Sequence, residues 1–205
     1  MSLRTLLDEP VARVALRGRV LAPWRRRRFH AFGAGSVIHR PLAIYAPWQI
    51  SVGRSVLVLH GAWLSVERPA WEEPGPALRL GDFVAVRPYC TISAALSVTI
   101  EDHVVLSAYS TVIDCNHTQV QGTPNVLWTP LESAPVRIGT GTWVGERCAI
   151  LAGADIGRQC IIGANSVVTG RIPDHCVAVG APARVVRRLP GFDEQAAEPE
   201  PTDAV

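Results

Sequence analysis

Residues 138–169 read IGTGTWVGERCAILAGADIGRQCIIGANSVVT, and this stretch decides the fold. An aliphatic residue recurs at every sixth position: Ile138, Val144, Ile150, Ile156, Ile162 and Val168. Four residues after each of the first five stands a small one: Thr142, Cys148, Ala154, Cys160 and Ser166. A helix repeats every 3.6 residues and a strand every two, so neither produces a period of six. The period is that of the hexapeptide repeat of a parallel β-helix.

This repeat predicts how the residues stack. Three hexads complete one triangular coil, so residues 18 apart lie above one another, Ile138 on Ile156 and Val144 on Ile162. The aliphatic side chain fills the prism and the small residue fits near a corner. Glycine follows several of the aliphatic positions, as at Gly145, and tolerates backbone angles that other residues resist.

The period extends upstream with interruptions. It runs through Leu80, Val86, Ile92 and Val98, slips by two residues, and resumes at Ile100, Leu106 and Val112. Imperfect coils are expected from Phe32 onward, and residues 67–77, rich in proline and charge, are expected to loop out. The next coil is due at position 118, but the pattern returns only at Ile138. Residues 118–137 are therefore predicted to form a long external loop, and such loops are usually functional.

The two ends of the chain differ from the coils. Residues 1–31 are predicted to be a helical and basic segment, residues 32–189 the β-helix domain, and residues 190–205 an acidic disordered tail. The arginine run at 25–28 is either a solvated turn or a contact with an anionic membrane.

Composition excludes several functions. The net charge is only +2, which does not indicate nucleic-acid binding, and no lysine is present to form a Schiff base. No apolar run is long enough for a transmembrane helix and no secretory signal is visible, so a cytoplasmic protein is expected. None of the five cysteines forms a CxxC pair, and Cys148 and Cys160 hold small core positions.

Three features together resemble a known family. These are the hexads, the histidine that stands before the long loop (Asp114-Cys115-Asn116-His117), and the sequence GAPAR at residues 180–184 that closes the repeats. Over residues 32–189 the chain resembles the hexapeptide-repeat acyltransferases, which include the galactoside, maltose and serine acetyltransferases. It is most similar to the sugar O-acetyltransferases of polysaccharide gene clusters, with which it shares a phrase like YAPWQISVGRSV. The resemblance implies an all-β, left-handed parallel β-helix, although ordinary parallel crossovers are right-handed.

The resemblance also assigns residues. The catalytic histidine of the family matches His117, and its coenzyme-binding positions fall on Glu146, Ala164, Thr169, Gly170, Arg184 and Arg187. Glu146 replaces a serine of the galactoside enzyme, a change that a backbone contact would survive and a side-chain contact would not. Arg87 replaces an active-site asparagine, which affects the expected acceptor more than the reaction. The candidate substrate contacts are Arg87, Asp114, Asn116, Trp128 and Trp143.

These residues suggest a reaction. A neutral imidazole, whose unperturbed pKa is about 6.5, suits the removal of a proton from an acceptor hydroxyl, so His117 is expected to be the general base. A backbone N–H near Gly145 and Glu146 would stabilise the oxyanion, and no acyl-enzyme on Cys115 is needed. Arg184, Arg187 and Arg188 can pair with the coenzyme phosphates.

The expected activity is O-acetylation of a sugar or polysaccharide precursor by acetyl-CoA, without a metal and in a homotrimer whose sites lie between subunits. The first alternative is N-acylation of an amino sugar. A non-catalytic scaffold and a γ-carbonic-anhydrase-like zinc enzyme are remote alternatives. The zinc enzyme needs three histidines around the metal, and the positions expected to stack on His117 are Thr99 and Asp155.

Overall fold

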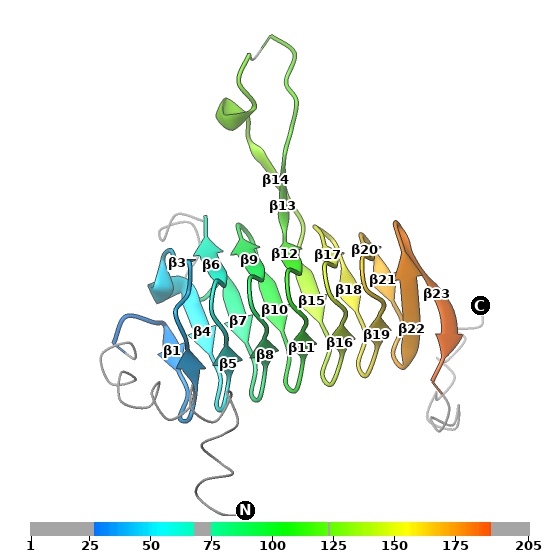
Figure 1. Cartoon of the computed structure of the whole chain (residues 1–205). Helices are drawn as coiled ribbons and strands as arrows, with labels where there is room; N and C mark the ends of the chain where they lie inside the picture. Colours follow the sequence, from blue (N-terminus) through cyan, green and yellow to red (C-terminus); the bar gives the residue numbers. More distant parts are fainter. Residues whose placement is uncertain (1–26, 68–74, 123, 190–205) are drawn as a thin grey trace, which may run out of the picture.

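The hexads fold into three parallel sheets that form the walls of a triangular prism, a left-handed parallel β-helix (Figure 1). The structure is a computed structural model that describes residues 27–67, 75–122 and 124–189. The predicted helical segment and the acidic tail lie outside these ranges, except for residues 27–31. Within them, no helix is long and apolar enough to cross a membrane.

Each sheet takes one short strand from every coil. Sheet A contains β1 (Ala31–Phe32), β4 (Ile50–Val52), β7 (Leu78–Leu80), β10 (Val98–Ile100), β15 (Val136–Ile138), β18 (Asp155–Ile156) and β21 (Arg171–Ile172). Sheet B contains β2 (Val37–Ile38), β5 (Leu57–Val58), β8 (Ala85–Val86), β11 (Val105–Leu106), β16 (Trp143–Val144), β19 (Ile161–Ile162), β22 (Cys176–Gly180) and β23 (Ala183–Arg188). Sheet C contains β3 (Ala43–Ile44), β6 (Trp63–Val66), β9 (Thr91–Ala94), β12 (Thr111–Ile113), β17 (Ala149–Ile150) and β20 (Val167–Val168).

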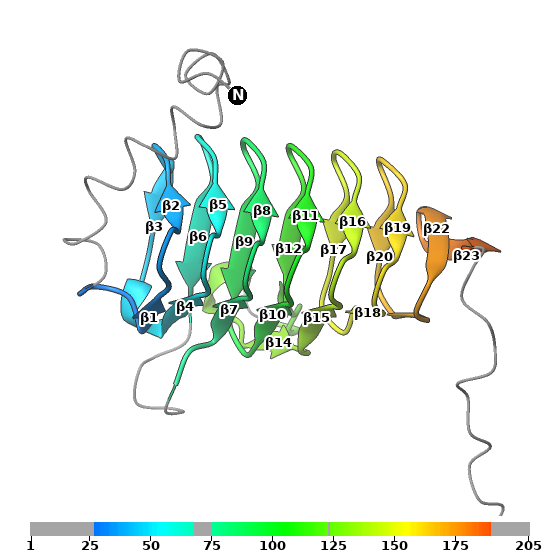
Figure 2. The same ribbon diagram turned by 90° about the horizontal axis from the view of Figure 1, so that it is seen from below.

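Four further elements lie outside these walls. The strands β13 (Cys115–His117) and β14 (Leu131–Ser133) pair only with each other. Two short 3-10 helices, η1 (Pro47–Gln49) and η2 (Val126–Trp128), complete the described elements. We call the turns between sheets corner AB, corner BC and corner CA, each named after the sheets that it joins; the turns of corner BC form the row along the upper edge of Figure 2.

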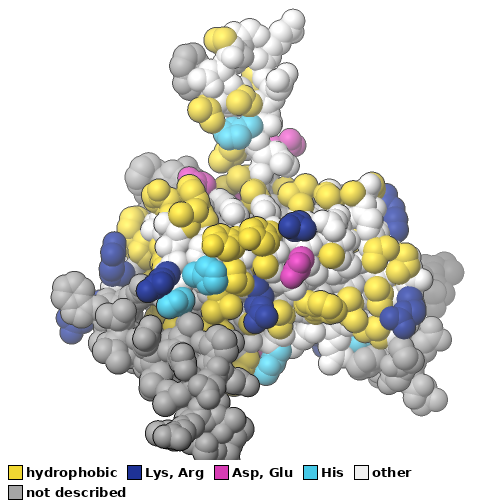
Figure 3. Space-filling view, in the orientation of Figure 1, with side chains coloured by type: hydrophobic (Ala, Val, Ile, Leu, Met, Phe, Trp, Pro, Cys, Tyr) yellow, Lys and Arg dark blue, Asp and Glu magenta, His cyan; other side chains and the backbone are white. Residues whose placement is uncertain are grey.

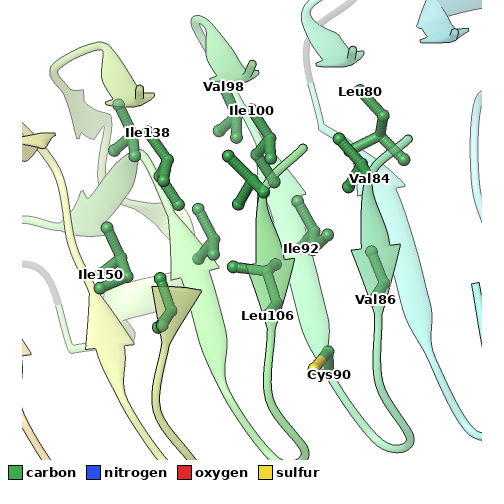
Figure 4. Close-up of a cluster of buried hydrophobic side chains, with 14 of the residues drawn as sticks. Leu80, Val84, Val86, Cys90, Ile92, Val98, Ile100, Leu106, Ile138 and Ile150 are labelled. Atoms are coloured by element: carbon green, nitrogen blue, oxygen red, sulfur yellow. The ribbon is translucent and has the colours of Figure 1, made fainter. Parts of the chain in front are cut away.

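The predicted stacking is confirmed. Ile138 pairs with Ile156 and Val144 with Ile162, each 18 residues apart. The aliphatic side chains point into the prism and are fully buried, as Figure 4 shows for Leu80, Val86, Ile92, Ile100, Leu106, Ile138 and Ile150. The first strand begins at Ala31, and Phe29 already belongs to the core, so the coils begin slightly before Phe32.

The small residue four places after each aliphatic does more than fit a corner. The Thr142 hydroxyl donates to the carbonyl of Gly157 in the next coil (2.9 Å) and accepts from the N–H of Cys160 (3.0 Å). Ser110 links Gly145 and Cys148 in the same way, and the Cys148 thiol donates to the carbonyl of Gly163 (3.1 Å). Since these groups are buried, the bonds satisfy backbone atoms that water cannot reach.

This bonding makes a stability prediction. Replacing Thr142 with valine keeps the shape but leaves a buried carbonyl and a buried N–H without the hydroxyl. We expect the free energy of unfolding to fall by about 1–3 kcal/mol. The matched control is Thr111→Val, since Thr111 faces outward from β12 and should change stability by less than about 0.5 kcal/mol. Denaturant titration of both variants measures the difference, and equal midpoints would contradict the bonding role.

The long loop has different boundaries from those predicted. It was expected at residues 118–137, but Val136 and Arg137 already pair with Val98 and Thr99 in sheet A, and the chain leaves the prism by Cys115. The reason is the two-residue slip. Because of it, β10 begins at Val98, two residues before Ile100, and its partner β15 has the same length and begins two residues before Ile138. Arg137, and not His117, therefore lies between Thr99 and Asp155.

Candidate active site

The catalytic candidate His117 lies on an arm, residues 114–135, that projects from corner CA (Figure 1). The base of the arm is the antiparallel pair β13 and β14, in which His117 is opposite Leu131. The arm returns to the coils at Ala134, whose N–H donates to the carbonyl of Asp114 and whose carbonyl accepts from Gly153. Both ends of the arm are thus fixed to the prism, and the His117 side chain is exposed beyond them.

Asp114 is fully buried, so it does not fit its predicted role as a substrate contact. Its two carboxylate oxygens accept the backbone N–H groups of Ala95, Leu96 and Ser97 at 2.6, 2.8 and 2.6 Å. Those three residues form the corner of the preceding coil, next to the two-residue slip. Asp114 therefore caps an irregular corner at the root of the arm, and both of its carboxylate oxygens are occupied by backbone N–H groups.

The arm also separates two of the predicted contacts. Neighbouring residues of a β-ribbon point to opposite sides, so Asn116 and His117 face away from each other. Asn116 and its cross-strand partner Glu132 both lie on the side of the ribbon that faces away from His117. Trp128 lies further out, in η2. Beyond His117, the arm encloses a hollow of about 460 Å³ lined by Thr118, Gln119, Val120, Pro124, Asn125, Val126 and Thr129.

The environment of the Cys115 thiol, two residues before His117, favours its protonated form. Partial burial raises the pKa of Cys115, and the nearby charges of Asp114 and Glu67 raise it further. A thiol with a raised pKa is a weak nucleophile at neutral pH. This environment agrees with direct attack by the acceptor rather than with an acyl-cysteine.

A second group of candidates lies at corner BC. Glu146 follows β16 and Ala164 follows β19, one coil further on. The coils approach closely there, since a Cβ on Gly145 would lie 2.6 Å from the Ala164 nitrogen. The N–H groups of Gly145 and Arg147 donate to carbonyls of neighbouring coils, whereas within the described residues those of Glu146 and Ala164 donate to none. Near Gly145 and Glu146, where the sequence predicts a backbone donor, the N–H of Glu146 is thus left without a backbone acceptor among the described residues.

Trp143 and Arg87 lie on the same side of the molecule. Trp143 points outward from β16, half exposed, and its indole N–H donates to the Ser107 hydroxyl (2.8 Å), which fixes the ring against the preceding coil. The exposed Arg87 lies one coil before Ser107, and its backbone N–H donates to the carbonyl of Leu106.

The arginines at the end of the coils share the outer face of sheet B because of a β-bulge. β23 pairs antiparallel with β22, with Arg187 opposite Val177 and Arg184 opposite Val179, and the register shifts between them. Residues three apart in a regular strand would face opposite sides, but the extra residue of the bulge restores a common side. Trp143, Ile161, Val177 and Arg187 are successive partners across sheet B, spanning about 14 Å at roughly 4.8 Å per strand.

The remaining coenzyme candidates lie elsewhere. Thr169 and Gly170 follow β20 at corner CA, where the Thr169 carbonyl lies 4.0 Å from a Cβ built on Gly153. They share that corner with the root of the arm. The predicted site residues therefore fall into two groups on one chain: Trp143, Glu146, Ala164, Arg184 and Arg187 on sheet B and corner BC, and His117, Thr169 and Gly170 at corner CA. Sheet C lies between the two.

Corner BC also carries side chains that the sequence analysis did not select. The rings of Tyr89 and Tyr109 stack at 5.2 Å, the guanidinium of Arg147 lies 5.7 Å from the Tyr109 ring centroid, and His60 meets Tyr89 edge-on. Hydrophobic groups interspersed with charged ones extend along the coils in Figure 3. The 20-residue spacing of the two tyrosines, equal to the local coil length, was the signal that could have revealed them.

No metal site accompanies these groups in the described part of the chain, where no three His, Cys, Asp or Glu side chains are placed to hold an ion.

Known proteins resemble this chain over the repeats. Residues 135–170 match the sequence model of the bacterial transferase hexapeptide (six repeats). The probable acetyltransferase Rv3034c of Mycobacterium tuberculosis is 38% identical over 111 residues, which cover 54% of this chain and 37% of that protein. The putative lipopolysaccharide biosynthesis O-acetyl transferase WbbJ of Escherichia coli is 35% identical over 114 residues, 52% of this chain and 58% of that protein. The chain thus spans between about a third and three fifths of these relatives.

Solved structures share the fold over more of the chain. AntD, an N-acyltransferase from Bacillus cereus in complex with dTDP and 3-hydroxybutyryl-CoA, has a TM-score of 0.67 and 18% identity, covering 82% of this chain and 88% of AntD. The hexapeptide-repeat-containing acetyltransferase VCA0836 of Vibrio cholerae, complexed with acetyl coenzyme A, has a TM-score of 0.57 and 18% identity, covering 91% of this chain and 88% of that one. The chain therefore carries, in residues 135–170, the hexapeptide repeat of the bacterial transferases, on a β-helix whose fold it shares with these two solved structures.

Proposed function

We propose that the protein transfers an acetyl group from acetyl-CoA to a hydroxyl of a sugar or polysaccharide precursor. The observation that carries the proposal is the alignment of Arg184 and Arg187 on the outer face of sheet B, in line with Trp143 on β16. The arginines suit the coenzyme phosphates, and β16, about 14 Å from Arg187, leads into the turn of Glu146, which suits the thioester end.

The division of the site supports a homotrimer. His117 belongs to corner CA and the proposed coenzyme face belongs to sheet B, so one subunit would supply the base and its neighbour the coenzyme. The outward residues of sheet B, such as Val105, Trp143 and Ile161, are apolar, whereas those of sheet A, such as Arg79, Arg137 and Asp155, are charged. Apolar faces are the ones that subunits cover. Sedimentation at monomer mass under native conditions would contradict this assembly.

The chemistry is a direct transfer. The His117 imidazole removes the proton of the acceptor hydroxyl while its oxygen attacks the thioester carbon. The oxyanion that forms accepts the N–H of Glu146. When the tetrahedral intermediate collapses, the carbon–sulfur bond breaks, and the coenzyme leaves as a thiolate that takes up the proton.

The acceptor class rests on the relatives. WbbJ is named as an O-acetyl transferase of lipopolysaccharide biosynthesis, which favours a sugar hydroxyl. AntD is an N-acyltransferase, which keeps an amino sugar as the second candidate. Release of free thiol from acetyl-CoA, measured with matched hydroxyl and amino sugars, distinguishes the two. Faster turnover with the amino sugar would reverse the order.

The coenzyme assignment predicts a binding defect. The double variant Arg184→Ala/Arg187→Ala should bind acetyl-CoA more weakly, because each lost charge-assisted contact costs about 1.5–3 kcal/mol, or at least about tenfold in Kd. The matched control is Arg79→Ala/Arg171→Ala, which removes two exposed arginines from sheet A. Calorimetry measures both, and unchanged affinity in the first variant would overturn the assignment.

A further inference from the structure

The N-terminal end of the prism exposes large apolar side chains. Leu42, Tyr45 and Trp48, from the segment around β3 and η1, are 69%, 54% and 57% exposed. Tyr45 is further joined to Trp63, whose ring centroid is 5.5 Å away. Single exposed apolar residues are common, but several large ones gathered on one short segment mark an interaction surface.

The same end of the chain is strongly basic. Residues 10–66 contain nine arginines and neither aspartate nor glutamate, although the whole chain has a net charge of only +2. Within the described residues, Arg54 forms an ion pair with Asp82, whereas Arg27, Arg28 and Arg40 are exposed and no ion pair joins them to a described carboxylate. The compensating acidic residues all lie outside residues 10–66, so the positive charge is concentrated in this part of the sequence.

A hollow brings the apolar and basic groups together. Its volume is about 320 Å³, and it is lined by Phe29, Pro41, Leu42, Ile44 and Pro47 with Arg28 among them. Apolar walls beside a guanidinium suit a ligand with a hydrocarbon part and an anionic part.

We propose that this end of the β-helix docks on an anionic lipid surface. Tryptophan and tyrosine favour the boundary between headgroups and acyl chains, leucine enters the acyl region, and arginines attract acidic headgroups. A nucleic-acid surface would also be basic and aromatic, but aliphatic side chains such as Leu42 and Ile44 around the hollow fit hydrocarbon better than bases. The proposal does not depend on the acyl-transfer assignment, and it would place the enzyme where a lipid-linked acceptor is found.

Co-sedimentation of the full chain with vesicles tests the proposal. We expect binding to phosphatidylglycerol mixed with phosphatidylcholine, little binding to phosphatidylcholine alone, and a loss of binding at high salt. The variant Arg27→Gln/Arg28→Gln/Arg40→Gln should bind about a hundredfold more weakly, at about fivefold per charge. The variant Leu42→Ser/Trp48→Ser should lose at least about tenfold, because both side chains would leave the hydrocarbon boundary.

Two control variants change exposed side chains of the same kinds elsewhere on the prism. Arg79→Gln/Arg171→Gln removes exposed charges from sheet A, and Phe83→Ser removes a half-exposed ring at corner AB. Both should bind vesicles as the parent does. Equal binding to neutral vesicles, no binding, or equal losses in the control variants would overturn the proposal. A single-stranded oligonucleotide bound with the same losses would assign the surface to nucleic acid, and a lower oligomeric mass of the Leu42 and Trp48 variant without lipid would assign it to a second copy.

Discussion

Replacing His117 with alanine is expected to reduce acetyl transfer by about 10²- to 10⁴-fold, the usual effect of losing a general base. The fold and coenzyme binding should remain, because the side chain is exposed on the arm and the proposed coenzyme contacts lie on sheet B and at corner CA. Steady-state kinetics with the true acceptor measure the effect, since slow hydrolysis of acetyl-CoA does not require this base.

The arm provides its own control for this experiment. Glu132 is exposed on the paired strand β14, on the side of the ribbon away from His117, so Glu132→Ala should change the rate by less than about tenfold. If His117→Ala keeps more than about a tenth of the parent rate, the general-base assignment is wrong. If Glu132→Ala is equally inactive, the effect lies in the shape of the arm and not in the imidazole.

Replacing Asp114 with alanine is expected to lower the free energy of unfolding more than replacing Thr142 with valine does. The backbone N–H groups of Ala95, Leu96 and Ser97 lose a carboxylate acceptor that is fully buried in the corner. Each bond to a charged group contributes about 1.5–3 kcal/mol, so the free energy of unfolding should fall by about 3–5 kcal/mol even if the corner partly relaxes. Denaturant titration measures the change.

The Asp114→Ala substitution should also displace the arm that carries His117. Since the Asp114 carbonyl also accepts the Ala134 N–H where the arm returns, a loosened corner displaces both ends of the ribbon that carries His117. The matched control is Glu132→Ala, which removes an exposed carboxylate from β14 and should leave stability within about 0.5 kcal/mol. If the two variants unfold at the same denaturant concentration, Asp114 does not support the corner.

The sequence alone determined the repeating part of this protein. In residues 138–169 each coil contributes equivalent residues at a fixed spacing, so the period of six predicts burial, coil length and pairing partners together. This worked because the coils are local and repetitive: each aliphatic residue meets the residue 18 positions away, and no distant contact is needed to place it. The small corner residues were found for the same reason, although their bonds to the next coil were not.

The tertiary structure decided what happens where the repeat is interrupted. An inserted segment has no period, so the period of six did not place Val136 and Arg137 in sheet A, and it did not show that Asp114 would turn inward to hold the corner at Ala95–Ser97. The β-bulge in β23 is likewise a matter of pairing between two strands, yet it alone places Arg184 and Arg187 on one face. The coils follow from spacing along the chain. The division of the candidate site between corner CA and sheet B depends on the corner from which an inserted segment leaves the prism, and only packing in three dimensions determines that corner.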